Sequence, residues 1–245
     1  MENLITAREF YNLLVFDYKI KSLTGNIKFQ LGSISIDVAR RDFIGEALQK
    51  WICEFLTRAQ FDFIPNPLPC SSPDIYLNPK NLRSNWLEIK AFNGDDNPRF
   101  SIAGFNFFVD DCIRRPWRLD ADYLIFGYSL NIDTGEFKIK DLWLKKIWEI
   151  TKPMNKWPLT VKSSGGSITE IRPCTWYAVK AKKKIFENLE DFLSALEAVI
   201  SRNPDTNGKA AKWRKKFLTN YKNYYGHEIK IPNWNDIKYK YEINY

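Results

Sequence analysis

The run DYLIFGYSL, residues 122–130, constrains the fold more than any other stretch of the chain, because it places nearly continuous apolar side chains between polar flanks. A strand with one wet face alternates apolar and polar residues, whereas an apolar run of this length predicts a strand buried on both faces. Such a strand needs a sheet around it and covering layers on both sides. The stretch DTGEF, residues 133–137, then indicates a hairpin turn into a further strand, FKIKDLWL.

Residues 41–56, RDFIGEALQKWICEFL, repeat apolar side chains at intervals of three and four, which predicts a helix with Asp42 as its N-cap. Further helices are expected at 7–20, at 101–113 with Ser101 as the cap, at 187–200 and at 208–226. Short strands are expected at 61–65, 74–78 and 85–92, an irregular loop with one short strand at 24–38, and a flexible loop at 162–167. This order predicts an α/β fold, with a mixed central β-sheet flanked by helices.

The chain has 245 residues, of which 44% are apolar and 27% charged, so it can bury a core and disorder is not expected. We expect one domain, residues 1–245, with a core at about 40–145 and a basic, partly helical C-terminal elaboration at about 146–245. We detect no signal peptide and no apolar run of the roughly 18 residues that would span a bilayer, so we expect a soluble, cytoplasmic protein without a membrane partner.

The positive charge is concentrated in one region, because residues 145–222 hold 17 Lys and Arg against 7 Asp and Glu. Such an excess favours a polyanionic partner such as nucleic acid, although a solvated, soluble surface is the alternative. The four cysteines lie far apart, and the only histidine is His227. A Cys/His zinc site and histidine-based nucleophilic catalysis are therefore disfavoured, and carboxylates and lysine are left as candidate catalytic groups.

The stretch SSPDIYLNPKNLRSNWLEIKAFN, residues 71–93, gathers three charged residues around two predicted strands. In a strand over 85–92, Glu88 and Lys90 point to the same face, and Asp74 begins the preceding strand. If the two strands pair, the three side chains converge at one end of the sheet. A divalent cation would remove the repulsion between the two carboxylates, and hard oxygen ligands suit Mg²⁺.

The same three charges also suit a hairpin with one wet face, and periodicity alone does not separate the two interpretations. A second Glu-x-Lys, formed by Glu136 and Lys138, follows a predicted turn. We interpret that second motif as a solvated sheet edge.

Pro73-Asp74 followed by Glu88-Ile89-Lys90, with a helix before and a strand after, resembles the PD-(D/E)XK nucleases. The runs KSLTGNIKFQLGSISI, FIGEALQKW and LEIKAFN are similar to restriction enzymes grouped with NgoBV and NlaIV. The resemblance implies a restriction-endonuclease-like core and a type II restriction endonuclease that cleaves double-stranded DNA with Mg²⁺. It also implies a GGNNCC-type palindrome as the target and a homodimer whose symmetry matches that of the site.

The resemblance also implies roles for individual residues. Asp74 and Glu88 would bind the metal, together with the backbone carbonyl of Ile89, and Lys90 would be the lysine of the motif. Glu46 occupies the place of a helix glutamate that assists the site in many members, although a solvated helix position is the alternative.

Candidate DNA-binding residues are polar or basic and lie in three regions. Asn93 and Arg99 follow the Glu-Ile-Lys strand, and Arg114, Arg115 and Arg118 surround Trp117. Arginine can read guanine in the major groove, but a helix end with cations is the alternative for this group. Lysines and an arginine of the C-terminal half suit phosphate contacts, namely Lys182, Lys183, Lys184, Lys209, Lys212, Arg214, Lys215 and Lys216.

Other functions remain open from the sequence. A structure-specific repair or junction nuclease would use the same chemistry, and a non-catalytic DNA-binding protein would carry the motif by chance. A two-carboxylate hydrolase acting on sugars is a third possibility, which the basic excess disfavours.

Overall fold

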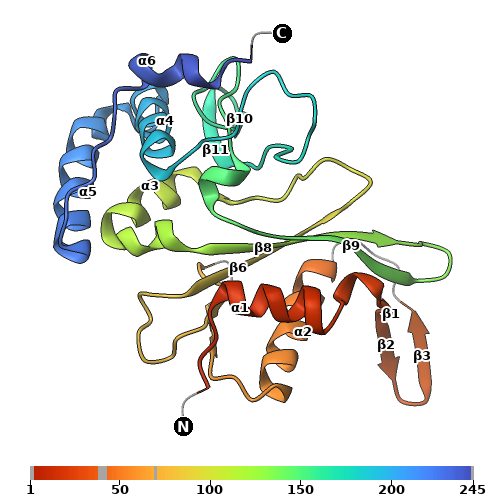
Figure 1. Cartoon of the computed structure of the whole chain (residues 1–245). Coiled ribbons are helices and arrows are strands. Elements are labelled where there is room, and N and C mark those ends of the chain that lie inside the picture. Colours follow the sequence, from red (N-terminus) through yellow and green to blue (C-terminus); the bar gives the residue numbers. More distant parts are fainter. Residues whose placement is uncertain (1–2, 38–42, 69–70, 244–245) are drawn as a thin grey trace. The chain divides into compact units, whose positions relative to one another are not determined.

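The computed structural model describes residues 3–37, 43–68 and 71–243 (Figure 1). The chain divides into two compact units, one of residues 1–98 and 120–145 and the other of residues 99–119 and 146–245. The predicted N-cap Asp42 lies outside the described residues. No described helix combines the length and apolar character needed to cross a bilayer.

The first unit is built on a mixed six-stranded sheet with the strand order β1-β9-β8-β6-β5-β4. Strands β6 and β8 pair in parallel, and the other neighbouring strands pair antiparallel. The predicted α/β fold with a mixed central sheet is therefore confirmed. The bounds are β1 Thr24–Asn26, β4 Ile64–Pro65, β5 Ile75–Tyr76, β6 Trp86–Asn93, β8 Asp122–Leu130 and β9 Glu136–Lys145, with a separate hairpin of β2 Lys28–Leu31 and β3 Ile34–Asp37.

Two helices, α1 Ala7–Asn12 and α2 Ile44–Arg58, lie on one side of this sheet in Figure 1. Helix α1 begins with a capping box between Thr6 and Glu9 and continues as a π-helix, Leu13–Asp17, before a 3-10 turn at Ile20–Ser22. Helix α2 buries Ile44, Leu48, Ile52 and Leu56, which recur every four residues as the sequence predicts. These side chains share one core with residues of β6 and β8, namely Leu87, Ile89, Leu124 and Phe126.

This packing determines which way the side chains of β6 point. Because Leu87 and Ile89 face the helical core, Glu88 and Lys90 project from the opposite face of the sheet. The central strand β8 is buried at every residue from Tyr123 to Tyr128, so the prediction of a strand covered on both faces is confirmed.

The second unit contains a three-stranded antiparallel sheet, β10-β11-β7, and four α-helices among its described residues. Trp213 of α5 donates its indole N–H to the carbonyl of Val109 in α3 at 2.9 Å, and Phe108 of α3 meets Phe192 of α4 edge to face. The bounds are β7 Ala103–Gly104, β10 Val161–Ser164, β11 Ser167–Ile171, α3 Phe105–Arg114, α4 Leu189–Arg202, α5 Ala210–Tyr225 and α6 Trp234–Ile237. Short 3-10 segments occur at Pro116–Asp120, Ile147–Ile150, Asn207–Lys209 and Lys238–Tyr241.

Three local predictions are wrong. Ser101 does not cap a helix, because the chain from Ile102 to Gly104 pairs with β11 and α3 begins only at Phe105. The loop predicted at 162–167 is the β10–β11 hairpin, whose turn uses Gly165 and Gly166 with positive φ. Residues 24–38 contain three short strands in their described part rather than a loop with one.

Candidate active site

The β5–β6 hairpin brings the predicted charged residues together. Strand β5 pairs with β6 in the register Ile75 with Leu87, and the backbone N–H of Asp74 donates to the carbonyl of Leu87 at 3.1 Å. The two strands thus pair, which is the condition on which the expected convergence depends. Asp74 therefore lies just before β5, beside the part of β6 that carries Glu88.

The Asp74 carboxylate interacts electrostatically with both Glu88 and Lys90. Its Oδ2 accepts the backbone N–H of Ile89 at 2.6 Å. Burial and, to a smaller extent, the negative charge of Glu88 raise the pKa of Asp74 to about 6, while Lys90 and the Ile89 N–H oppose the shift. The two carboxylates and the lysine are thus one electrostatic cluster.

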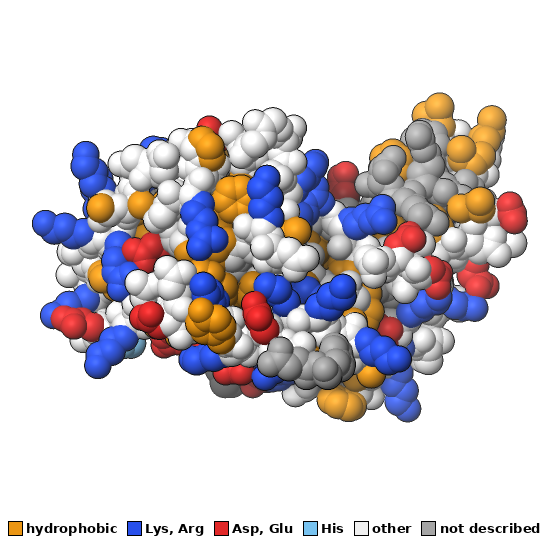
Figure 2. Space-filling view, turned by 90° about the horizontal axis from the view of Figure 1, so that it is seen from above, with side chains coloured by type: hydrophobic (Ala, Val, Ile, Leu, Met, Phe, Trp, Pro, Cys, Tyr) orange, Lys and Arg blue, Asp and Glu red, His pale blue; other side chains and the backbone are white. Residues whose placement is uncertain are grey.

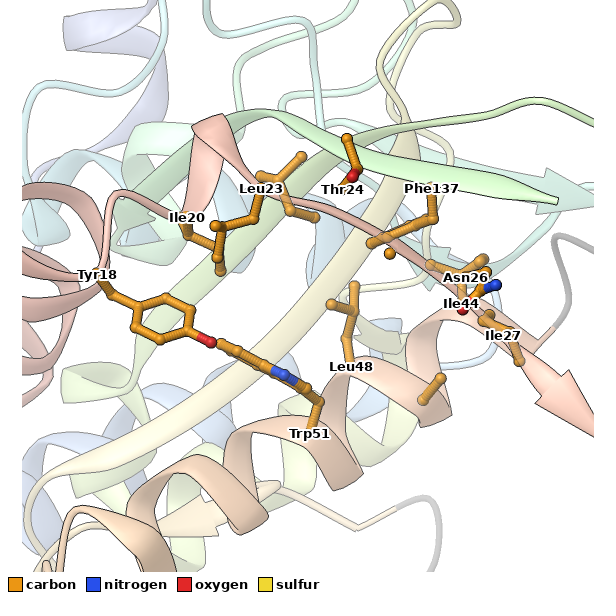
Figure 3. A pocket seen from close by; sticks show the side chains of 13 residues that line it. Tyr18, Ile20, Leu23, Thr24, Asn26, Ile27, Ile44, Leu48, Trp51 and Phe137 are labelled. Atoms are coloured by element: carbon orange, nitrogen blue, oxygen red, sulfur yellow. The ribbon is translucent and has the colours of Figure 1, made fainter. Parts of the chain in front are cut away.

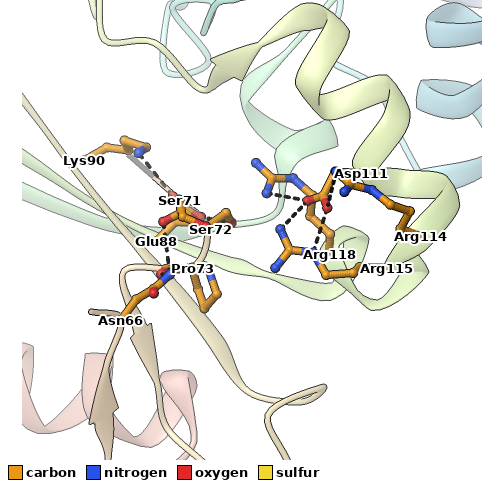
Figure 4. Close-up of polar contacts among 10 residues, drawn as sticks. All are labelled: Asn66, Ser71, Ser72, Pro73, Glu88, Lys90, Asp111, Arg114, Arg115 and Arg118. Atoms are coloured by element: carbon orange, nitrogen blue, oxygen red, sulfur yellow. Dashed lines mark hydrogen bonds and ion pairs between the residues drawn. The ribbon is translucent and has the colours of Figure 1, made fainter. Parts of the chain in front are cut away.

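Glu88 is held by a partner at each carboxylate oxygen (Figure 4). Only 3% of the residue is exposed, its Oε2 lies 3.1 Å from the Lys90 ammonium, and its Oε1 accepts a hydrogen bond from the Ser72 hydroxyl. A buried carboxylate is costly unless it is paired and hydrogen-bonded, and both conditions hold here. The strand therefore keeps a charged group inside the fold at a defined position.

Two residues of this cluster were not predicted from the sequence, Ser72 and Asn66. The Asn66 amide donates to the carbonyls of Pro73 at 2.8 Å and Ser71 at 3.3 Å, and its backbone N–H donates to the Asp74 carbonyl at 3.0 Å. The one sequence signal was the polar run Ser-Ser before Pro-Asp, which gives no indication of where a hydroxyl will point.

The oxygen atoms that the chain presents beside β5 and β6 suit a hard divalent cation. The chain offers the carboxylates of Asp74 and Glu88, and the Ile89 carbonyl is directed to the same strand edge as the Ile89 N–H that meets Asp74. Among the residues described, no group of three or more His, Cys, Asp or Glu side chains is placed to hold a metal. Two carboxylates and a carbonyl suit Mg²⁺, which keeps several waters and takes substrate phosphate oxygens as further ligands.

Glu46 lies on the exposed side of α2. Its carboxylate is paired with Lys50 at 2.7 Å, one turn along the helix, and this hydrogen bond lowers the pKa of Glu46. It also lines a groove of about 630 Å³ whose walls include Cys53 and Asn66. The structure thus places Glu46 on a surface shared with Asn66, and pairs it with a lysine rather than with Asp74 or Glu88.

The three candidate arginines at the end of α3 and just after it contact one buried carboxylate, Asp111 (Figure 4). Arg115 contacts both of its oxygens, at 2.6 and 2.7 Å, and Arg118 contacts Oδ2 at 2.9 Å while its guanidinium lies over the Phe108 ring. Arg118 is only 4% exposed, whereas the Arg114 side chain is 64% exposed. Arg118 is therefore packed as a core group, and Arg114 is the most accessible of the three.

Asn93, the last residue of β6, and Arg99, which follows the strand, differ in their contacts. The Asn93 amide donates to Asp96 at 3.1 Å and closes the turn at the end of the strand. Arg99 is exposed, and its backbone carbonyl accepts a hydrogen bond from Arg172. Asn93 thus has a local structural partner, whereas the Arg99 side chain is accessible.

The basic candidates of the C-terminal half are mostly exposed. Figure 2 shows Lys and Arg side chains spread over the visible face. Arg214 and Lys183 are the exceptions, because both are only partly exposed, and Arg214 is bound to Glu197 at 2.5 Å and to the Ile231 carbonyl at 2.8 Å. Lys183 lies 3.9 Å from Glu242, and the accessible members are Lys182, Lys184, Lys209, Lys212, Lys215 and Lys216.

A separate pocket of about 360 Å³ in the first unit is mainly apolar (Figure 3). Leu48 and Trp51 of α2 form one wall, Phe137 and Ile139 of β9 contribute to another, and the Tyr18 ring lies against Trp51. None of its described lining residues carries a charge. This pocket lacks the groups for hydrolysis that the Asp74–Glu88–Lys90 cluster has.

Comparisons with known proteins agree with one another. The family model described as NgoBV restriction endonuclease matches residues 4–241. The type II restriction enzyme NlaIV of Neisseria lactamica is 40% identical over 239 residues, which cover 97% of this chain and 98% of that protein. The type II restriction enzyme NgoBV of Neisseria gonorrhoeae is 35% identical over 159 residues, covering 65% of this chain and 90% of that protein.

A solved structure of the NlaIV restriction endonuclease has the same fold. It superposes with a TM-score of 0.94 at 39% identity, covering 99% of this chain and 98% of that one. The predicted restriction-endonuclease-like architecture is confirmed by this match.

Proposed function

Because the chain belongs to the NgoBV restriction endonuclease family, we propose that it cleaves double-stranded DNA at one specific sequence, with Mg²⁺ bound by Asp74 and Glu88. The prediction of a type II restriction enzyme is confirmed by the match to NlaIV, which spans nearly the whole chain. The metal, the target and the residue roles are our proposal. The observation that carries it is the convergence of Asp74, Glu88 and Lys90 beside the paired strands β5 and β6.

Each of these side chains has a role that its position supports. Asp74 and Glu88 supply carboxylate oxygens from adjacent strands, and the Ile89 carbonyl supplies a third oxygen. When bound, Mg²⁺ would acidify a water and neutralise charge on the phosphoryl oxygen. Lys90, held 3.1 Å from Glu88, presents a fixed ammonium that orients the attacking water and stabilises the developing negative charge.

Binding of DNA would use the accessible cations of the C-terminal half, with Arg114 and Arg99 as further candidates. Contacts of this kind neutralise phosphates and position the duplex without reading its sequence. We propose a homodimer in which each subunit cuts one strand of a GGNNCC-type palindrome, because the symmetry of such a site matches a twofold dimer.

The test is digestion of mixed-sequence plasmid DNA by the purified protein. We expect discrete fragments with Mg²⁺, none with EDTA, and fragment ends that map to one GGNNCC-type sequence. Cleavage governed by DNA structure, with fragments unrelated to sequence, would favour a repair or junction nuclease instead. Failure to cut with Mg²⁺ would reject the proposal, and one defined site of another sequence would reject only the target.

A further inference from the structure

We propose that Ser72 is a positioning residue for Glu88 and that Asn66 holds Ser72 in place, so that one loop, residues 71–74, sets both proposed metal ligands. The proposal rests on the proposed function, because it assigns Glu88 to the metal site. It adds two residues that lie outside the Pro-Asp and Glu-x-Lys motifs.

The first observation is the pair of contacts on Glu88. The Ser72 hydroxyl donates to Oε1, while Lys90 lies against Oε2. A glutamate has three rotatable side-chain bonds, and a partner on each oxygen restricts the carboxylate to one orientation. Lys90 alone would leave the carboxylate free to turn about its ion pair.

The second observation is that the loop carrying Ser72 is itself fastened. Asn66 contributes three hydrogen bonds to the loop, two from its side-chain amide to Ser71 and Pro73 and one from its backbone to Asp74. The Asn66 Oδ1 in turn accepts the backbone N–H of Leu68 at 3.1 Å, which orients the amide. The same loop therefore delivers the Asp74 carboxylate and the hydroxyl that holds Glu88.

The third observation is burial. Ser72 is 7% exposed and Glu88 is 3% exposed, so water does not readily replace the hydroxyl as a donor to the carboxylate. Outer partners of metal-binding carboxylates typically change metal affinity or activity about 10- to 100-fold when they are removed. We expect an effect of that size from loss of the Ser72 hydroxyl.

The experiment compares Ser72→Ala with a matched control, Ser84→Ala. Ser84 lies in the turn at the other end of the β5–β6 hairpin, and its hydroxyl donates to the Asn81 carbonyl at 3.2 Å. For each variant, binding of Mn²⁺ to the DNA-free protein is followed by the EPR signal of free Mn²⁺. Single-turnover cleavage of plasmid DNA is measured alongside, with Ser72→Thr as a variant that restores a hydroxyl.

We expect Ser72→Ala to weaken Mn²⁺ binding or slow the cleavage step about 10- to 100-fold, with an unchanged half-saturating protein concentration in the single-turnover assay. We expect Ser84→Ala to match the parent and Ser72→Thr to recover most of the loss. A Ser72→Ala protein within about twofold of the parent in both measurements would overturn the proposal, as would a defect that the Ser84→Ala protein shares.

Glu88→Ala, assayed in parallel, separates this proposal from the proposed function. If Glu88→Ala loses cleavage and Ser72→Ala does not, only the role of Ser72 is rejected. If Glu88→Ala cuts as well as the parent, the metal site itself is rejected.

Discussion

Two of the chain's Glu-x-Lys motifs lie on strands of the same sheet, and they differ in almost everything except their spacing. On β6, the side chains of Glu88 and Lys90 are 4% and 18% exposed, with 3.1 Å between Oε2 and Nζ. On β9, those of Glu136 and Lys138 are 50% and 48% exposed, with 2.7 Å between carboxylate and ammonium. The shorter ion pair belongs to the motif that we consider non-catalytic.

A close Glu–Lys ion pair therefore does not by itself identify the proposed active site. Exposed pairs contribute little to stability and are screened by salt. The pair on β6 is distinguished by a second carboxylate, Asp74, and by the Ser72 hydroxyl on the same glutamate. The solvated interpretation of the β9 motif is confirmed by its exposure, although β9 is not an edge strand, because β1 pairs alongside it.

The largest expected difference between the two motifs is in cleavage. We expect Glu88→Ala and Lys90→Ala each to reduce single-turnover cleavage about 100- to 1000-fold, because each removes a charge that acts on the reacting phosphate or its metal. Glu136→Ala and Lys138→Ala remove the matched exposed pair and should retain the parent rate. Equal losses from both motifs would contradict the assignment of catalysis to the motif on β6.

The next difference concerns stability and its dependence on pH. The pKa of Asp74 is about 6 in the folded state and 3.8 in the unfolded state, so folding favours the protonated carboxyl group. The stability that this group contributes is fully present below pH 3.8 and is lost as pH rises through about 6, because the carboxyl group must then ionise inside the fold. In metal-free buffer at pH 8, Asp74→Asn should therefore be more stable than the parent by up to about 3 kcal/mol, less any screening by solvent.

Denaturant unfolding in EDTA between pH 5 and pH 8 measures this effect. The gain should shrink towards the acid end of the range and should also fall when Mg²⁺ stabilises the parent. Asp133→Asn, at the exposed turn before the β9 motif, is the control and should change little. A gain for Asp74→Asn that does not vary with pH would contradict the electrostatic origin.

A smaller effect is expected at α2, where two glutamates have matched surroundings. Glu46 pairs with Lys50 at 2.7 Å and Glu54 pairs with Arg58 at 2.6 Å, both one helical turn along. If Glu46 assists the site, Glu46→Ala should slow cleavage about tenfold while Glu54→Ala has no effect. Equal rates in a plasmid cleavage assay would remove Glu46 from the site.

The smallest expected effect per residue is on DNA binding by α5. Lys212 and Lys215 are exposed, whereas Arg214 between them is bound to Glu197. Each lysine-to-alanine change should reduce the slope of log affinity against log salt by about 1. Arg214→Ala should instead lower the melting temperature, and a lysine variant with an unchanged salt slope would exclude that lysine from phosphate contact.

The relative positions of Asp74, Glu88 and Lys90 could largely be predicted from the sequence. The alternation in 85–92 placed Glu88 and Lys90 on one face, and the turn before it placed Asp74 on a neighbouring strand. Those inferences depend on local periodicity, which the sequence displays directly.

The remaining features depend on contacts between distant segments. Ser101 does not cap a helix as predicted, because the residues from Ile102 to Gly104 pair with β11. Arg118 was a candidate for base contact, but Asp111 and the Phe108 ring hold it inside the second unit. The proposed role of Ser72 depends on the conformation of loop 71–74, which Asn66 holds by hydrogen bonds. No periodic pattern in the sequence predicts that conformation.

We propose that Asp74 and Glu88 hold one metal ion, and anomalous scattering from Mn²⁺ in crystals of the protein would locate that ion. We predict one strong peak within coordination distance of both carboxylates and of the Ile89 carbonyl, and no peak beside Glu136 and Lys138. A Mn²⁺-loaded, cleavage-competent protein whose peak lies elsewhere, away from Asp74 and Glu88, would rule out these two residues as the metal ligands.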